Sequence, residues 1–448
     1  MITTMEKSSF VIFFIYILTL LFMGGVYSFY WFLLFSLLLL FWGYKKYYTV
    51  IKYKVYRDFR VNIELSILVF ILYSFIMFIP LFHNTPDENF LKEFNDLWTT
   101  LKIASKRDSN FINFHYFSAT VEVLMILSAY LWIKLILLYR KKILSNYKYL
   151  FILYNLVIIT SFFNLGIVEL FSPKKVEILG FFVNDVHFAT FITVPLPIII
   201  FYLFKGKNKT TSEYIFKSLY IMVILYILAS LHERMSVLSI LIVLFIYFLI
   251  YIKNNRLKNI NKKKILFLII LIIILGLTTT YTFMERGRSI LFKREFVETL
   301  NLNFRLEALS ISWNIFKDNW LLGIGAGQFS LVYPLYSKNE LFFMHHLHNE
   351  YLQFLVEYGV LGVSIIFWGY FNLFKTIIYG IKNLKSVHKN LFIAHLFAIL
   401  IFHIQIVSDF QLHIGALLLM LLFFITMLYV IIYDCESYQK KKNEIKNI

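Results

Sequence analysis

Three histidines lie within four positions of the segment HHLHNEYLQFLVEYGVLG, residues 345–362. Histidine is the side chain best matched to proton transfer near neutral pH, so this segment is a candidate for general-base chemistry. Leu352, Leu355 and Val356 follow His348 at helical spacing, which predicts a helix with an apolar face whose edge His348 shares. Gly359 and Gly362, in the same segment, then indicate a tight helix join with close backbone approach.

Metal binding is the other chemistry that these histidines could support. His345 and His348 would be three residues apart on a helix, and Glu350 or Glu233 could supply a third ligand. The spacing is not that of the HExxH motif, and the chain has only one cysteine, so we expect no metal. For His345 and His346 we favour solvated histidines at the membrane boundary. For His348, a solvated and a chemical role are equally open.

Two arginines could recognise a phosphate, because guanidinium stays charged and presents forked donors. Arg234 lies in LHERMSVLSIL, between two apolar runs, and Arg305 opens RLEALSISWNIFKDNWLLGIGAGQFS. The alternative is that Arg234 pairs with Glu233, and that the other cations of the second region, Arg288 among them, neutralise nearby glutamates.

The segment that Arg305 opens has apolar residues at steps of three and four, which predict an amphipathic helix. These residues are Leu306, Leu309, Trp313, Phe316 and Trp320. The GIGAG that follows is predicted to be a flexible turn before the histidine segment. A dinucleotide site is a weak interpretation, because GIGAG follows a helix and not a strand.

Further polar residues lie at the ends of apolar runs. Asn184, Asp185 and His187 open one run, and Asp409 lies in the turn SDFQLH before the last. Each is ordinary alone. Together they indicate a site built between membrane spans from distant parts of the chain.

The elements that must position these residues are membrane helices. The chain has 448 residues, of which 60% are hydrophobic and only 16% charged, against about 25% charged in soluble proteins. Uncharged runs such as 9–23 and 265–281 approach the roughly 20 residues that span a bilayer. The first run lacks a small-residue cleavage site and is expected to remain a span. The predicted class is an all-α polytopic membrane protein.

Twelve apolar spans are predicted, at 9–24, 27–43, 63–82, 115–138, 149–168, 185–204, 214–231, 235–252, 265–281, 359–374, 391–408 and 413–433. With both termini inside, most lysines and arginines fall on the inner side, as the positive-inside rule requires. The net charge of +18 is therefore mainly a topology signal and not a nucleic-acid footprint. We interpret residues 1–448 as a single integral membrane domain. Residues 282–358 form a large outer loop of short amphipathic helices between spans nine and ten.

Four motifs together resemble the O-antigen ligase and O-antigen polymerase superfamily. HNEYLQFLVEYGVLG fits His-Asn, nine residues, then Gly-x-x-Gly, and RMSVL fits Arg-x-x-x-Leu. RLEALSISWNIFKDNWLLGIGAGQF is similar to the segment preceding that histidine, and NDVHFA resembles the polar start of a middle span. The resemblance covers the C-terminal half; the first 180 residues match only as hydrophobic spans.

This resemblance implies a GT-C-like, metal-independent, inverting glycosyltransferase without a cofactor. It would lie in the bacterial inner membrane with its site facing the periplasm, and its donor would be a glycan on undecaprenyl diphosphate. By motif, His348 matches the catalytic base, Arg234 the Arg-x-x-x-Leu arginine and Arg305 the loop arginine. The residues expected to bind substrate are Arg288, His346, Asn349, Asn184, His187 and Asp409.

Three acceptors compete within this interpretation. We favour an O-antigen ligase that transfers to lipid A–core, then a polymerase that transfers to another lipid-linked glycan. A protein O-oligosaccharyltransferase ranks third, because that class often carries further C-terminal sequence. The rival of a different class is a lipid-linked glycan transporter, or flippase. Transporters usually show repeats and deep ionisable residues, whereas here only Lys134 and Glu122 are clear intramembrane candidates.

Overall fold

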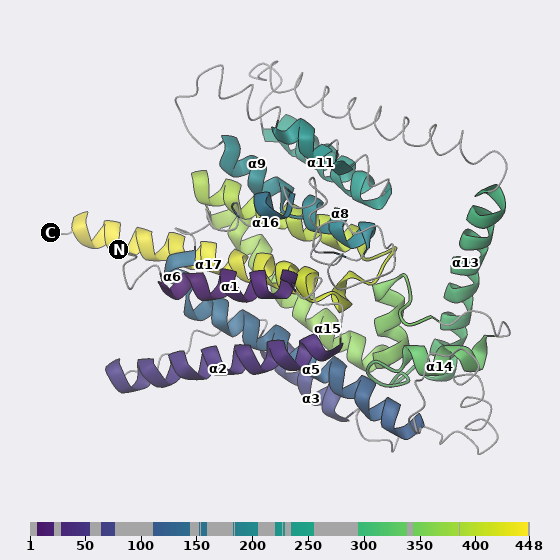
Figure 1. The fold of residues 1–448 in the computed structure, drawn as a ribbon. Coiled ribbons are helices and arrows are strands. Elements are labelled where there is room, and N and C mark those ends of the chain that lie inside the picture. Colours follow the sequence, from purple (N-terminus) through teal and green to yellow (C-terminus); the bar gives the residue numbers. More distant parts are fainter. Residues whose placement is uncertain are drawn as a thin grey trace. The chain divides into compact units, whose positions relative to one another are not determined.

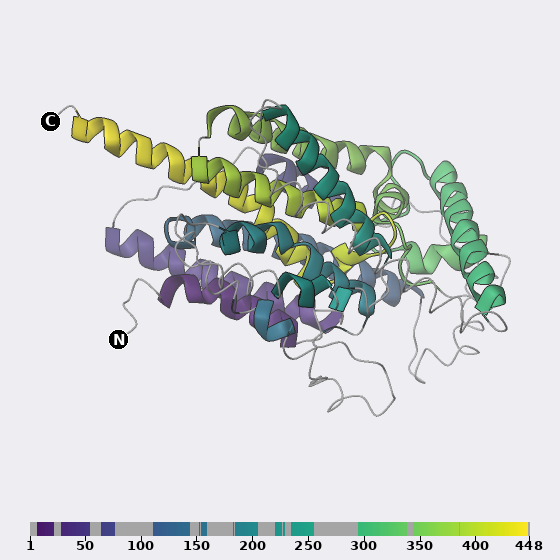
Figure 2. The same ribbon diagram turned by 90° about the horizontal axis from the view of Figure 1, so that it is seen from above.

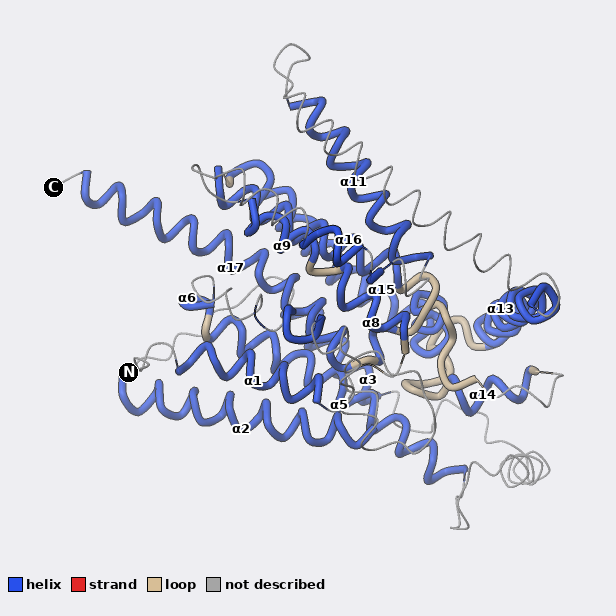
Figure 3. Tube along the Cα trace, turned by 45° about the horizontal axis from the view of Figure 1, so that its top comes forward, coloured by secondary structure: helices blue, strands red, loops and turns tan. Residues whose placement is uncertain are grey.

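The computed structural model describes residues 7–21, 28–53, 64–76, 111–143, 152, 154–158, 182, 184–204, 220–225, 227–228, 234–254, 294–337, 344–384 and 386–446. The regular elements assigned in these ranges are all helices, drawn blue in Figure 3 and labelled in Figure 1. They are α1 (Lys7–Leu21), α2 (Ser28–Tyr53), α3 (Glu64–Ile76), α5 (Phe111–Leu138), α6 (Arg140–Ile143), α8 (Asp185–Thr193), α9 (Leu196–Phe204), α11 (Arg234–Asn254), α13 (Arg294–Asp318), α14 (Phe329–Tyr336), α15 (Glu350–Asn383), α16 (Ser386–Gln405), the 3-10 turn η6 (Gln411–His413) and α17 (Gly415–Lys446). The predicted all-α class is confirmed for this part of the chain.

Within the described residues, four helices are long and apolar enough to cross a bilayer: Phe117–Leu138, Asp185–Leu203, Glu350–Asn383 and Gly415–Glu436. Three shorter apolar helices cover Tyr30–Tyr44, Leu65–Phe75 and Met235–Tyr247. A helix suits this setting because it satisfies its own backbone hydrogen bonds where lipid offers no partners. The chain is therefore an α-helical membrane protein. The number twelve and the inside–outside topology stay predictions, and the span 265–281 lies outside the described residues.

Several helix boundaries differ from the predicted spans. The candidate span that begins at Asp185 is interrupted between α8 and α9, because Pro195 has no N–H to continue the ladder. The carbonyl of Pro195 accepts from the nitrogens of Ile198 and Ile199. The helix predicted at 359–374 follows a non-helical Gly359 inside α15, as the predicted join requires, and ends later, at Asn383. The last helix continues beyond residue 433 to Lys446, as Figure 2 shows in yellow. Hydropathy marks only the lipid-matched part of a helix, whereas Lys, Gln and Glu are good helix formers that extend it.

The chain divides into two compact units, each assembled from segments that are distant in sequence. Unit one comprises Met1–Val26, Tyr139–Asn301 and Ile378–Ile448; unit two comprises Tyr27–Leu138 and Leu302–Ile377. Because the chain passes repeatedly between the units, sequence order alone does not separate them. The interpretation as a single domain stays a prediction.

Unit one is built around α17, whose apolar stretch is 89% buried. Helices α1, α8 and α16 pack against it, and α16 also contacts α9 and α11. The buried hydroxyl of Tyr16 in α1 donates to the carbonyl of Ala416 at 2.9 Å. This bond gives a carbonyl in the first turn of α17 a second donor and ties α1 to the last helix.

Unit two pairs α2 and α3 with α5 and builds a second core around the end of α13. Ala308, Ile311 and Ile315 of α13 are buried in that core. The predicted amphipathic helix is confirmed, and two of its predicted apolar residues, Leu309 and Phe316, pack against this core. Leu306, Trp313 and Trp320 are 55%, 48% and 54% exposed, because the small and β-branched residues face inward instead. The buried residues of this core are Ala308, Ile311, Ile315, Ile324, Phe329, Tyr333, Met344, Leu347 and Val356.

Candidate functional site

His348 lies in the irregular segment 344–349, directly before α15. The prediction that it lies on the helix is wrong, because Asn349 ends the irregular segment as the N-cap. Its side-chain oxygen accepts from the nitrogen of Leu352 at 3.0 Å, which satisfies an amide at the helix start. His345 therefore does not share a helical face with His348. The described residues contain no group of three or more His, Cys, Asp or Glu side chains that could hold a metal.

The helix α15 buries a polar stripe beside this segment. Glu350, Gln353 and Glu357 are each at most 1% exposed and lie at spacings of three and four. Sequence reasoning did not single out this stripe. The sequence contains an indication of this stripe, namely three polar residues at helical spacing. The apolar residues at 352, 355 and 356 were instead taken to define the buried face.

Gln353 connects the stripe to the histidine segment. Its Oε1 accepts from the backbone nitrogen of Leu347 at 2.8 Å, and its Nε2 donates to Glu357 Oε1 at 3.2 Å. The same Nε2 lies 3.3 Å from Nδ1 of His346. His348 thus lies between two fixed residues. Leu347 is held by the bond from its backbone nitrogen to Gln353, and Asn349 is held by its cap of α15.

The glycine-rich loop after α13 is held against α15. The nitrogens of Ile324 and Gly325 each donate at 3.0 Å, to the carbonyls of Val356 and Glu357. The Glu357 carboxylate also accepts from the nitrogen of Phe329 at 3.3 Å. The predicted flexible turn is therefore wrong, because these bonds fix the loop. The same contacts join the loop to the helix that carries Gln353.

Close backbone approach at Gly359 and Gly362, in contrast, is confirmed. Gly359 has φ +61° and kinks α15. A Cβ on Gly362 would lie 2.5 Å from Cβ of Tyr358 and 2.8 Å from a ring carbon of Tyr73. The Tyr73 hydroxyl lies 3.0 and 2.9 Å from the carbonyl oxygens of Leu322 and Tyr358, which share its one hydrogen. Helix α3 thereby secures both the loop and the kink.

Arg305 lies on α13, one turn before Ala308, and its side chain is exposed. Ala308 belongs to the same buried core as Leu347, the residue before His348. The helix of the arginine and the segment of the histidine therefore share one core in unit two. His348 itself is half-buried.

Arg234 is the first residue of α11 and belongs to unit one. Its side chain and all of Arg288 lie outside the described residues. The convergence of Arg234 and Arg305 on His348 thus stays a prediction.

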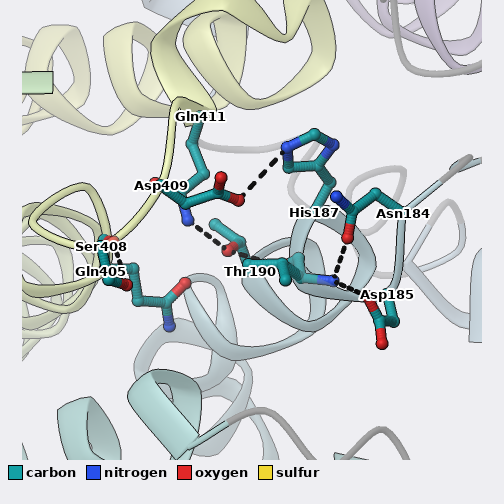
Figure 4. Close-up of polar contacts among 9 residues, drawn as sticks. Asn184, Asp185, His187, Thr190, Gln405, Ser408, Asp409 and Gln411 are labelled. Carbon is teal, nitrogen blue, oxygen red and sulfur yellow. Dashed lines mark hydrogen bonds and ion pairs between the residues drawn. The ribbon is translucent and has the colours of Figure 1, made fainter. Parts of the chain in front are cut away.

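Unit one brings together three of the predicted polar residues (Figure 4). His187 Nε2 lies 3.4 Å from Asp409 Oδ2, and both side chains are 3% exposed. The sequence predicted that these residues, from distant segments, contribute to one site, and the structure places them in contact. Asn184 is the N-cap of α8, with its Oδ1 accepting from the nitrogen of Val186 at 2.8 Å.

Glutamines extend this buried cluster, and sequence reasoning missed them. Gln405 Nε2 donates to Thr193 Oγ1 at 2.7 Å and to Ser239 Oγ at 3.1 Å, which ties together α8, α11 and α16. Gln411 Nε2 donates to Thr190 Oγ1 at 3.3 Å. In the described part of the chain, Oε1 of both glutamines is buried and accepts no hydrogen bond. Such acceptors suit a hydroxyl group or an internal water.

The two intramembrane residues, Lys134 and Glu122, are both buried in α5. Glu122 lies against the glycine loop: a Cβ on Gly327 would meet its Cγ at 2.7 Å. Ser118, one turn earlier, donates through its hydroxyl to the carbonyl of Gly327. In unit two, this ionisable residue therefore lies beside the loop that joins α13 to α14.

In a comparison with protein families, residues 219–367 fit the model of the family described as O-antigen ligase. The matched range contains Arg234, Arg305 and His348 together with Gln353 and Glu357. It excludes the His187–Asp409 pair. A comparison with curated proteins gives no match.

Proposed function

We propose that this chain, a member of the O-antigen ligase superfamily, is a glycosyltransferase that moves a glycan from undecaprenyl diphosphate to an acceptor hydroxyl. The favoured acceptor is lipid A–core, on the periplasmic face of the bacterial inner membrane. An O-antigen polymerase is the next candidate, and a protein O-oligosaccharyltransferase the third. The family match favours all three over a lipid-linked glycan transporter.

One observation supports this function most directly. His348 is half-buried at the start of α15, and both of its neighbours are fixed by side-chain hydrogen bonds. A general base must be held within hydrogen-bond reach of the proton that it removes. His348 meets this requirement because it directly follows Leu347, which shares a core with the helix of Arg305.

In the proposed reaction, a ring nitrogen of His348 takes the proton of the acceptor hydroxyl. The hydroxyl oxygen attacks the anomeric carbon, and the bond between that carbon and the diphosphate oxygen breaks. The diphosphate leaves with the bonding electron pair, and the configuration at the carbon inverts. A histidine base typically contributes roughly 10²–10⁴-fold to such a step.

Arg234 and Arg305 are proposed to bind the diphosphate as negative charge develops on its leaving oxygen. Guanidinium donors match phosphate oxygens in pairs, and they act strongly where water is excluded. Arg288 is proposed to assist them. No metal or cofactor is part of this mechanism.

The remaining predicted residues are proposed to contact the glycan. His346 and Asn349 flank His348, and Asn184, His187 and Asp409 come from unit one. Because the amide oxygens of both asparagines cap helices, their Nδ2 groups are the donors proposed for sugar oxygens.

The decisive experiment uses full-length protein in liposomes with a lipid-linked glycan and lipid A–core. His348→Ala should abolish transfer while thermal unfolding stays unchanged, because the side chain is outside the buried core. His345→Ala is the matched control and should retain transfer, since His345 is exposed three residues earlier. Unchanged turnover in His348→Ala would reject the assignment. Mass analysis of the product separates ligase, polymerase and protein glycosylation.

A further inference from the structure

We propose that Gln353 and Glu357 are positioning residues that hold His346 as a neutral imidazole, with its proton on Nε2. In that state His346 donates a hydrogen bond to an oxygen of the lipid-linked glycan. The identity of the ligand rests on the proposed function, whereas the position of the ring proton rests only on the contacts around Gln353.

The first step is the orientation of the Gln353 amide. A backbone N–H can only donate, and the nitrogen of Leu347 donates to this side chain at 2.8 Å. The atom that accepts must be Oε1. The amide is therefore not free to exchange its oxygen and nitrogen, and Nε2 must face the other two partners.

The second step follows the two hydrogens of Nε2. One is directed to Glu357 Oε1 at 3.2 Å, and the other partner is His346 Nδ1 at 3.3 Å. The carboxylate can accept from Nε2, and it also accepts from the nitrogen of Phe329 at 3.3 Å. Nδ1 of His346 must likewise accept, which requires that it carries no proton. A neutral ring with Nδ1 unprotonated has its proton on Nε2.

Burial of both side chains prevents the Gln353 amide from adopting the reversed orientation. Gln353 and Glu357 are each 1% exposed, so water does not easily replace a lost partner. A reversed amide would place NH₂ against the N–H of Leu347 and oxygen against the Glu357 carboxylate. Both contacts would then be repulsive, and buried groups left without partners are costly.

The two histidines therefore have different roles. His346 presents a donor N–H, whereas His348, two residues later, takes a proton in the proposed reaction. Glu357 also holds the glycine loop through the nitrogens of Phe329 and Gly325. One glutamate thus positions the loop after the Arg305 helix and, through Gln353, the ring of His346.

The test exchanges the two groups in the double variant Gln353→Glu/Glu357→Gln. The carboxylate introduced at position 353 can still accept from Leu347, and the amide oxygen introduced at position 357 can still accept from Phe329. Because Glu357 Oε1 accepts from both Phe329 and Gln353, the exchange loses the bond between positions 353 and 357 along with the donor to His346 Nδ1. The exchange therefore keeps the bonds from the two backbone nitrogens and removes the group that sets the ring proton. Ser364→Ala, which removes an exposed bond within α15, is the matched control.

The readout is solid-state ¹⁵N NMR of histidine-labelled full-length protein in liposomes at pH 8, with His346 assigned by comparison with His346→Gln. The wild type should show Nδ1 unprotonated and Nε2 protonated. In the exchange variant Nδ1 should be protonated, because the new carboxylate accepts from it. Glycan transfer should fall by about two- to tenfold, the usual effect of losing one hydrogen bond between neutral groups. Ser364→Ala should change neither signal.

A protonated Nδ1 in the wild type would overturn the proposal, as would an exchange variant with both wild-type ring signals and wild-type transfer. The wild-type spectrum decides the ring state even if the exchange variant fails to fold. A wild type with the expected ring signals but no glycan transfer would reject the glycan as ligand and the proposed function. It would leave the positioning of His346 intact.

Discussion

Gly323 and Gly359 meet backbone to backbone: a Cβ on Gly359 would lie 2.5 Å from the nitrogen of Gly323. The reverse contact is equally close, since a Cβ on Gly323 would lie 2.6 Å from the nitrogen of Gly359. This meeting places the loop that follows the Arg305 helix against the kink of α15. The polar stripe of α15 and the loop can therefore bond to each other directly.

Gly359→Ala should destabilise the protein. With φ +61° and ψ −172°, the position suits only glycine, and a side chain there costs about 1–3 kcal/mol before any clash. We expect a clear fall in the thermal unfolding midpoint in detergent. Gly43→Ala is the control, because a Cβ added to Gly43 in α2 would meet no neighbouring atom within 4 Å. That change should be neutral or stabilise by about 0.5–1 kcal/mol. Equal midpoints for the two variants would contradict the contact.

Tyr73→Phe should also destabilise, because its hydroxyl is the shared donor of two carbonyls, those of Leu322 and Tyr358. Leaving buried acceptors without a donor costs about 1–3 kcal/mol. Denaturant titration in detergent measures the loss. Ser36→Ala removes an exposed hydroxyl that bonds only within its own helix, and should cost little. A Tyr73→Phe variant as stable as Ser36→Ala would argue against the bridge.

Arg305→Lys should lower glycan transfer without unfolding the protein. The side chain is exposed, so stability does not depend on it, whereas a lysine cannot reproduce the forked donors of guanidinium. We expect a loss of roughly tenfold or more in kcat/KM. Lys317→Ala is the matched control, since Lys317 is an exposed cation on the same helix. If the two variants transfer equally well, Arg305 does not bind the diphosphate.

His187 and Asp409 should be energetically coupled. His187→Gln and Asp409→Asn each break a contact of 3.4 Å between side chains that are 3% exposed, and each should destabilise by about 1–3 kcal/mol. The double variant should lose less than the sum, with a coupling of about 0.5–3 kcal/mol. Additive losses in the cycle of unfolding measurements would show that the contact contributes nothing.

The sequence was most informative where local patterns carry the information. Long apolar runs predicted membrane helices correctly, and Gly359 with Gly362 predicted the close join. The same reasoning failed at His348 because two local signals competed. Apolar spacing favoured a helix through the histidines. Asn349 is instead a strong N-cap, so the helix begins after it, at Glu350.

The sequence by itself determined the helical membrane class and the residue types able to transfer a proton or bind a phosphate. Both follow from properties of short segments, since hydropathy and side-chain chemistry do not depend on what packs nearby. Only the tertiary structure decided that His187 meets Asp409, that Gln353 is buried and that the glycine loop is fixed by Glu357. Those outcomes depend on which distant segments pack together. Once a polar group is buried, it forms hydrogen bonds with whichever polar groups the packing places next to it.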